Sequence, residues 1–182
     1  LPKYMCMKDE WKEKLQYHTH FYMDLNWRKQ YVGVLEMEYD GIKFYFIDNE
    51  YYFNGYAPYG DMYADIEKFA FFSKAVLSAL PLIDFRPDII HCHDWQTGLV
   101  PIYLDNFRYG NEFYRGIKTV MTIHNLKFQG TWDPKRVRDI TGLPQYYFAP
   151  DKLEAYKDAN YLKGGIVYAD RVTTVSNSYA EE

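Results

Sequence analysis

The sequence has little cysteine and no long apolar run. Its two cysteines, Cys6 and Cys92, form neither a CxxC pair nor a disulfide framework, which is typical of a protein from a reducing compartment. No apolar run approaches the roughly 18 residues of a membrane-spanning helix, and the N-terminus is charged rather than signal-like. We therefore expect a cytoplasmic protein with no membrane segment and no membrane partner.

Dense runs of positive charge and phosphate-binding loops are absent as well. The 182 residues carry 21 basic and 25 acidic side chains, a net charge of −4, so the electrostatic footprint of a nucleic-acid-binding protein is missing. There is no GxGxxG or Walker motif, and Gly164-Gly165 after Lys163 is too short a signal to cradle phosphate by itself. We expect no nucleic-acid partner.

Apolar residues make up 48% of the sequence and charged residues 25%, which is typical of a globular chain of one domain. Tyrosine is abundant, with 20 residues. These rings could form a sugar-stacking surface, but the ordinary interpretation is that most of them pack at the edge of the core with their hydroxyls in water.

The first half of the chain predicts a β-hairpin followed by a helix. Residues 11–26 are polar and poorly periodic, whereas Tyr31 to Tyr39 and Ile42 to Ile47 are β-rich runs separated by Asp40-Gly41, a strong signal for a tight turn. Between residues 65 and 80, apolar side chains recur every three or four positions, which predicts a helix with one buried stripe.

The second half predicts strands that alternate with helices. Strands are expected at 88–93, 117–124 and 171–175, and helices at 97–107, capped by Thr97, and at 160–169. Residues 134–158 look irregular, with short helical pieces. This alternation favours parallel pairing. The predicted fold is therefore α/β, with a partly parallel sheet and one hairpin.

The two ends suggest a piece of a larger architecture. The first residue is Leu1, and Ser178 to Glu182 has the spacing of a helix-opening capping box with no helix after it. We expect the chain to begin and end inside a longer protein.

Polar residues follow each of the three predicted parallel strands. His91-Cys92-His93-Asp94 closes the first, His124-Asn125 the second and Ser176-Asn177 the third. Ligands of open parallel sheets bind at the carboxyl ends of the strands. We therefore expect the functional site there.

Three kinds of chemistry suit this cluster. His91, His93, Asp94 and His124 could hold a metal ion, although the sequence has only two other histidines, in a remote segment. Alternatively, without a metal, Asp94 and His124 could grip hydroxyls and stabilise a positively charged sugar transition state, with His91 and His93 serving packing and hydrogen bonding. Cys92 as a nucleophile is the third option, but the pleat separates its side chain from that of His93.

At these same residues the sequence resembles a known family. The segments H-C-H-D-W-Q-T-G-L (91–99), T-I-H-N-L-K-F-Q-G (122–130) and N-Y-L-K-G-G-I (160–166), the last running into A-D-R-V-T-T-V-S (169–176), are similar to those of bacterial glycogen synthases and plant starch synthases, glycosyltransferase family 5. Residues 45–52 and 65–72 also resemble family segments, with Lys68 in place of the usual arginine.

The resemblance implies a transferase that adds glucose from ADP-glucose to the non-reducing end of an α-1,4-glucan with retention, using no cofactor. It implies two Rossmann-like domains in the glycosyltransferase-B (GT-B) arrangement with a cleft between them. His124 would hydrogen-bond the donor glucose and Asp94 would lie near the reacting carbon. Asn125, Gln129 and Asn160 would line the cleft, and His93 would join them in binding substrate.

Two departures from the family pattern matter. The glycine-rich K-x-G-G-L loop and the whole second domain are missing, so residues 1–182 resemble an incomplete N-terminal, acceptor-side domain. We expect this piece alone to be inactive, because the positive charge that stabilises the leaving group is absent. Two rival hypotheses are a non-catalytic glucan-binding module built on the tyrosine-rich surface and a metal-dependent hydrolase that uses the histidine cluster.

Overall fold

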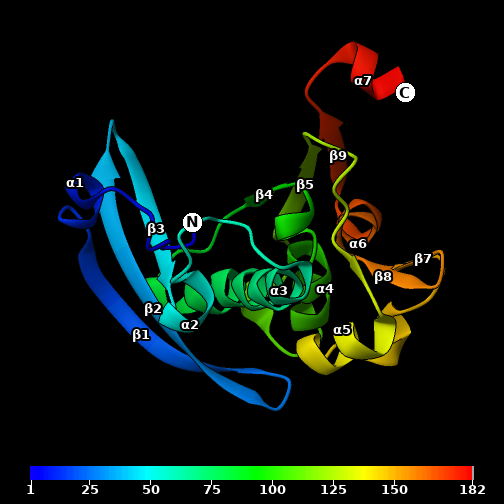
Figure 1. Cartoon of the computed structure of the whole chain (residues 1–182), viewed down its shortest axis with the longest axis horizontal. Coiled ribbons are helices and arrows are strands. Elements are labelled where there is room, and N and C mark those ends of the chain that lie inside the picture. The colour runs from blue at the N-terminus through cyan, green and yellow to red at the C-terminus, as the bar shows by residue number, and fades with distance from the viewer. Residues whose placement is uncertain (182) are drawn as a thin grey trace.

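A computed structural model describes residues 1–181, and Glu182 lies outside the described part. The main helices are α3 (Met62–Ala79), α4 (Val100–Arg108), α5 (Pro134–Thr141) and α6 (Tyr161–Tyr168), with short helices α1 (Asp9–Lys12), α2 (Glu50–Phe53) and α7 (Asn177–Glu181). Single 3₁₀ turns are η1 (Leu80–Ile83), η2 (Trp95–Thr97), η3 (Glu112–Tyr114) and η4 (Gln145–Tyr147). Figure 1 shows an antiparallel sheet on one side of α3 and a parallel sheet on the other.

The antiparallel sheet has three strands in the order β1 (Gln16–Leu25), β2 (Arg28–Tyr39) and β3 (Ile42–Asp48). The expected hairpin is confirmed: Asp40 and Gly41 have φ of 52° and 73°, the positive values that a tight primed turn needs. The expectation for residues 11–26 is wrong, because they include all of β1. Only Met23 and Leu25 of this strand are buried, so the alternation that marks a strand is weak.

The parallel sheet has the order β4 (Ile89–His93), β5 (Lys118–Ile123) and β9 (Arg171–Thr174). All three strands were predicted, and the α/β fold class is confirmed. A third, small sheet joins β6 (Thr131–Trp132), β8 (Asp158–Asn160) and β7 (Glu154–Ala155). Strand β7 and the first residue of β8 lie in the segment 134–158, which was expected to be irregular, and the short helical pieces expected there are α5 and η4.

One face of the parallel sheet is packed against helix α6 and turn η2, and small residues make this possible. A Cβ on Gly98 would overlap the carbonyl of Tyr161, and one on Gly165 would overlap the Met121 side chain. Gly164 likewise packs against Ile102 and Leu153. The Gly164-Gly165 pair therefore serves close helix–sheet packing. On the opposite face, His91, His93 and Thr173 are exposed.

Two expected helix starts differ from the structure. Helix α4 begins at Val100 with Leu99 at its N-cap, because the Thr97 hydroxyl instead bonds the backbone amide and carbonyl of His93. Helix α7 does form at the end of the chain, and it is Ser176, not Ser178, whose hydroxyl accepts a bond from the Tyr179 amide. Both hydroxyls bond to backbone that the sequence pattern does not reveal.

The tyrosines do not mainly pack at the core edge. Tyr103, Tyr147 and Tyr161 are fully buried, and burial raises the pKa of each of them. More than half of the twenty are exposed: Tyr17, Tyr22, Tyr31, Tyr39, Tyr51, Tyr56, Tyr59, Tyr63, Tyr109, Tyr146 and Tyr156. No helix within residues 1–181 combines the length and the apolar character needed to cross a bilayer.

Candidate functional site

The carboxyl ends of β4 and β5 are brought together by the carboxylate of Asp94. Its Oδ1 accepts hydrogen bonds from the backbone amides of His124, at 2.8 Å, and Asn125, at 3.2 Å. The Asp94 amide in turn donates to the Thr122 carbonyl at 3.0 Å. Two of the three strand ends that the sequence singles out are therefore one structural unit.

The backbone of Asp94 is strained. It has φ 55° and ψ −171°, a combination that is almost confined to glycine. Such a conformation costs on the order of 1–3 kcal/mol and persists only where the surroundings enforce it. Here the two amides enforce it, and the conformation turns the carboxylate away from the strand direction toward the neighbouring loop. Strain of this kind clusters at functional sites.

The histidines form a row beside Asp94. His93 Nδ1 lies 3.0 Å from His124 Nε2, so one ring donates and the other accepts. The rings of His91 and His93 lie 4.2 Å apart between centroids, which confirms that both side chains leave the same face of β4. Partial burial, together with His91 and His124, lowers the pKa of His93 against the opposing effect of Asp94. The environment of His93 therefore disfavours its protonated form.

His91 takes part in a hydrogen-bonded chain across the sheet. Its Nε2 lies 2.6 Å from the Thr122 hydroxyl, which lies 2.7 Å from the hydroxyl of Thr173. The expected hydrogen-bonding role of His91 is therefore confirmed. Its expected packing role is not, because the side chain is exposed in the described structure.

The two other chemistries find little support in this geometry. Among residues 1–181, no group of three or more histidine, cysteine or acidic side chains is arranged to hold a metal ion. His93 and His124 instead direct ring nitrogens at each other. Cys92 is buried on the opposite face of β4, and burial raises the pKa of its thiol to about 12. A thiol with this pKa stays protonated and is a poor nucleophile.

Asp94 opens into a pocket with a cavity volume of about 440 Å³. Its walls include two exposed aromatic rings, Tyr59 and Phe128, and its polar groups include Gln96 and Asn125. The Gln96 amide donates to the Tyr59 hydroxyl at 3.1 Å, which fixes one ring against the floor of the pocket. Aromatic rings with a few placed polar groups are typical of a site for a small organic ligand such as a sugar.

The loop that carries Tyr59 is fastened by a buried pair on α3. Asp65 accepts from the Gly60 amide at 3.0 Å and from Lys68 Nζ at 2.6 Å. Lys68 also donates to the carbonyl of Pro58 at 3.0 Å. Lysine at position 68 therefore still anchors the wall of the pocket, with single bonds in place of the planar fork of an arginine.

Gln129 lies near the end of the loop that follows β5, and Asn160 lies at the start of α6; neither is among the residues that line this pocket. Asn160 is only 3% exposed. Its side chain caps α6 by accepting from the Lys163 amide and donates to Gln129 Oε1 at 2.6 Å. Gln129 in turn donates to the carbonyl of Leu126 at 3.1 Å. In this chain the pair orders the loop that carries His124 and Asn125.

Sequence reasoning missed several residues of the site. Tyr59 and Gln96 lie about 37 positions apart in the chain and meet only in the fold. Gly130, with φ 63°, could have been found, because a Cβ there would overlap the ring of Trp95 that supports the pocket. A glycine that closes a polar loop before a strand is a signal for such close contact.

Known proteins resemble the whole chain. The family described as the starch synthase catalytic domain matches residues 1–182. The glycogen synthases of Lachnoclostridium phytofermentans and Lachnospira eligens are each 69% identical over 182 residues, which is 100% of this chain and 38% of each relative.

A solved structure agrees with these sequence matches. The catalytic domain of Starch Synthase IV from Arabidopsis thaliana, bound to ADP and acarbose, matches the fold with a TM-score of 0.83 and 28% identity, over 100% of this chain and 38% of that one. The chain thus spans well under half the length of the proteins that it matches. With the family matched from end to end, the chain belongs to the family of the starch synthase catalytic domain.

Proposed function

We propose that this chain is the acceptor-side part of a longer glycosyltransferase with the GT-B architecture. The complete enzyme would transfer glucose from ADP-glucose to the non-reducing end of an α-1,4-glucan, with retention at the anomeric carbon. Family membership, the names of the relatives and the ADP and acarbose of the plant structure support this proposal. The observation that carries it is the strained Asp94, held by two backbone amides at the mouth of an aromatic pocket.

Asp94 is suited to a reaction in which positive charge develops on a sugar. Both backbone bonds go to Oδ1, so Oδ2 keeps its lone pairs for the pocket. A fixed carboxylate stabilises developing positive charge without reorganising as the reaction proceeds. In the proposed mechanism, Asp94 lies against the donor glucose near the reacting carbon.

His124 is suited to hold a sugar hydroxyl. Its Nε2 is engaged by His93, which leaves Nδ1 for the substrate. An imidazole nitrogen can hydrogen-bond a sugar hydroxyl either as a donor or as an acceptor, depending on the tautomer. Asn125 adds an amide beside it, and Tyr59 and Phe128 offer faces on which glucose units of the acceptor can stack.

The groups that would hold the pyrophosphate of the donor lie, in this proposal, in other parts of the enzyme. We therefore expect the 182-residue chain alone to give no glucose transfer above background. The test is transfer of radiolabelled glucose from ADP-glucose to glycogen, by the complete enzyme and by the chain. Incorporation by the complete enzyme and none by the chain is the expected result. Activity of the chain alone would show that transfer does not need the other parts of the enzyme. An inactive complete enzyme would overturn the proposed function.

A further inference from the structure

A second groove lies at the far end of the antiparallel sheet, where the β1–β2 turn meets α5. Figure 1 shows the turn and α5 side by side. The cavity volume is about 760 Å³, and none of its lining residues belongs to the Asp94 pocket. Its polar lining includes Asn26, Asp133, Arg138, Asp139, Gln145 and Lys157.

An exposed tryptophan lies beside this groove: Trp27 follows Asn26 in the chain and bonds Asp139, and both of those residues line the groove. Trp27 is 71% exposed, yet its ring is held at two points. Its Nε1 donates to Asp139 Oδ1 at 3.0 Å, and the guanidinium carbon of Arg28 lies 4.3 Å from the ring centroid. One face of the indole is therefore covered by Arg28, and the other face is open to solvent. A large apolar ring fixed in this way loses little conformational entropy when a ligand stacks on it.

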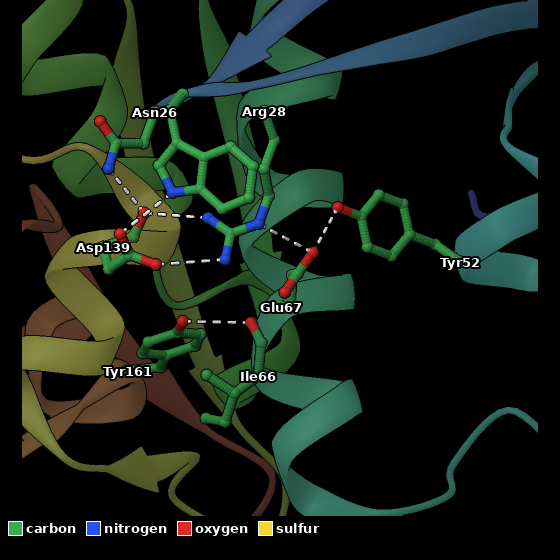
Figure 2. A network of polar contacts seen from close by, with 8 residues as sticks. Asn26, Arg28, Tyr52, Ile66, Glu67, Asp139 and Tyr161 are labelled. Atoms are coloured by element: carbon green, nitrogen blue, oxygen red, sulfur yellow. Dashed lines mark hydrogen bonds and ion pairs between the residues drawn. The ribbon is translucent and has the colours of Figure 1, made fainter.

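The fixed ring rests on a network of polar groups that reaches α3, drawn in Figure 2. Arg28 donates to the Asp139 carbonyl at 3.0 Å and to its carboxylate at 3.2 Å. Arg28 Nε also lies 3.4 Å from Glu67, whose carboxylate accepts from the Tyr52 hydroxyl at 2.8 Å. Because both Arg28 and Glu67 are largely buried, the support under Trp27 is rigid.

We propose that Trp27 and this groove form a second glucan-binding site, outside the Asp94 pocket. The proposal rests on the proposed function for the nature of the polymer. An open aromatic face fits the C–H face of a pyranose ring, and the mixture of amides, carboxylates and cations matches hydroxyls, which both donate and accept. Lys135, Arg138 and Lys157 line the groove as well as Asp133 and Asp139, so inorganic phosphate is the competing ligand that the test must include. The site would hold a long glucan on the enzyme while one chain end enters the Asp94 pocket.

The test is native gel electrophoresis of the 182-residue chain with increasing glycogen in the gel. We expect Trp27→Ala to weaken the affinity for glycogen about tenfold, as for loss of a stacked aromatic contact. Trp27→Phe should retain most of the affinity, because a ring remains. Tyr109→Ala is the matched control, since Tyr109 is 79% exposed and lies outside the groove. Its affinity should equal that of the parent chain.

Further variants keep the test decisive. If Trp27→Ala fails to fold, as judged by circular dichroism, Gln145→Ala serves instead, because Gln145 lies exposed in the groove and outside the supporting network. It should weaken the affinity about threefold. Unchanged affinity in the folded variants, or displacement of glycogen by inorganic phosphate, would overturn the proposal.

A failure of this site can be told apart from a failure of the proposed function. Asp94→Asn in the complete enzyme should lower transfer about 10³-fold and leave retardation by glycogen nearly intact. Trp27→Ala should raise the Michaelis constant for glycogen about tenfold and leave that for a short maltooligosaccharide unchanged. Equal effects on both acceptors would overturn the second site while leaving the transferase activity established.

Discussion

Two polar clusters of this molecule contrast in how their side chains are used. At the end of the parallel sheet, Asp94 is strained and His124 is exposed, and both keep hydrogen-bonding capacity that no group within residues 1–181 uses. At the joint between the antiparallel sheet and α3, Arg28 and Glu67 are buried and paired. Both clusters unite residues far apart in the sequence. Only the first combines a strained backbone with unused hydrogen-bonding atoms, as the proposed function requires.

This difference separates residues that serve the proposed reaction from residues that stabilise the fold. A buried charge pair is costly to break because the remaining partner stays desolvated. An exposed group with spare capacity contributes little to stability, so its removal leaves the fold intact. Variants of the first cluster should therefore change turnover, and variants of the second should change the free energy of unfolding.

The largest effect should come from Asp94→Asn in the complete enzyme. Asparagine has nearly the same shape as aspartate and its side-chain oxygen can still accept the two backbone bonds, so the fold should persist. The lost charge should lower turnover about 10³-fold, as for removal of a fixed group that stabilises the transition state. Steady-state kinetics on glycogen measure this.

Asp84→Asn is the matched control. Asp84 also has positive φ, 51°, but it precedes β4 and so lies at the opposite end of the strand from Asp94. Its turnover should stay within about twofold of the parent. Equal turnover in the two variants would remove Asp94 from the mechanism.

The next largest effect is expected for the Arg28–Glu67 pair between the antiparallel sheet and α3. Glu67→Leu leaves the Tyr52 hydroxyl without its partner and Arg28 with Asp139 alone. We expect a loss of about 3 kcal/mol in the free energy of unfolding, the lower end for breaking a buried pair. Urea denaturation measures it. Glu10→Leu on exposed α1 should change the free energy by less than about 0.5 kcal/mol. A kinetic defect in folded Glu67→Leu would show that the joint also acts on the reaction.

His124→Ala should lower turnover about 10²-fold with little change in the Michaelis constant, since it removes a bond that strengthens in the transition state. His91→Ala is the control on the same sheet. Because His91 is exposed and bonds only Thr122, its loss should cost about 1 kcal/mol of stability and no turnover. If His91→Ala lowers turnover and His124→Ala lowers only stability, the roles assigned to the two histidines are reversed.

The fold was largely predictable where one local signal dominates. The Asp40-Gly41 hairpin and the three parallel strands followed from turn chemistry and apolar runs. Strand β1 was missed because its exposed face dilutes the alternation. The Thr97 cap was wrong because a hydroxyl chooses among nearby backbone groups by geometry, and here it chooses those of His93.

The candidate site was predictable only in part, for a topological reason. Parallel strands direct their carboxyl ends to one edge, so the meeting of Asp94 with the end of β5 follows from the strand order alone. Tyr59 and Trp27 come from loops whose place depends on tertiary packing, and no spacing rule brings them to a pocket. Likewise, sequence could not reveal that Asn160 is buried as a helix cap.

The smallest expected effect concerns Asp170, a carboxylate at the end of the parallel sheet opposite Asp94. It tests whether a charge at that end stabilises the fold. Asp170 accepts bonds from the Thr119 amide and from Lys118 Nζ, both at 2.9 Å. Burial acts to raise the pKa of Asp170, but these bonds outweigh it and lower the pKa below the ordinary value of 3.8. A lowered pKa in the folded state stabilises the protein above about pH 4, and this stability is lost as the pH falls through the folded-state pKa.

Asp170→Asn removes the charge and keeps the shape. We expect it to lower the free energy of unfolding by about 1 kcal/mol at pH 7, since Asp170 is partly exposed. At low pH the protonated aspartic acid resembles asparagine, so the two proteins should converge in stability. Urea denaturation at pH 7 and pH 3 measures this, with Lys118→Met as a milder control that removes one partner. If the difference in free energy of unfolding between the two proteins stays constant with pH, Asp170 acts through its shape alone. Its charge would then not stabilise the fold, and the contrast with Asp94 would fail within this sheet.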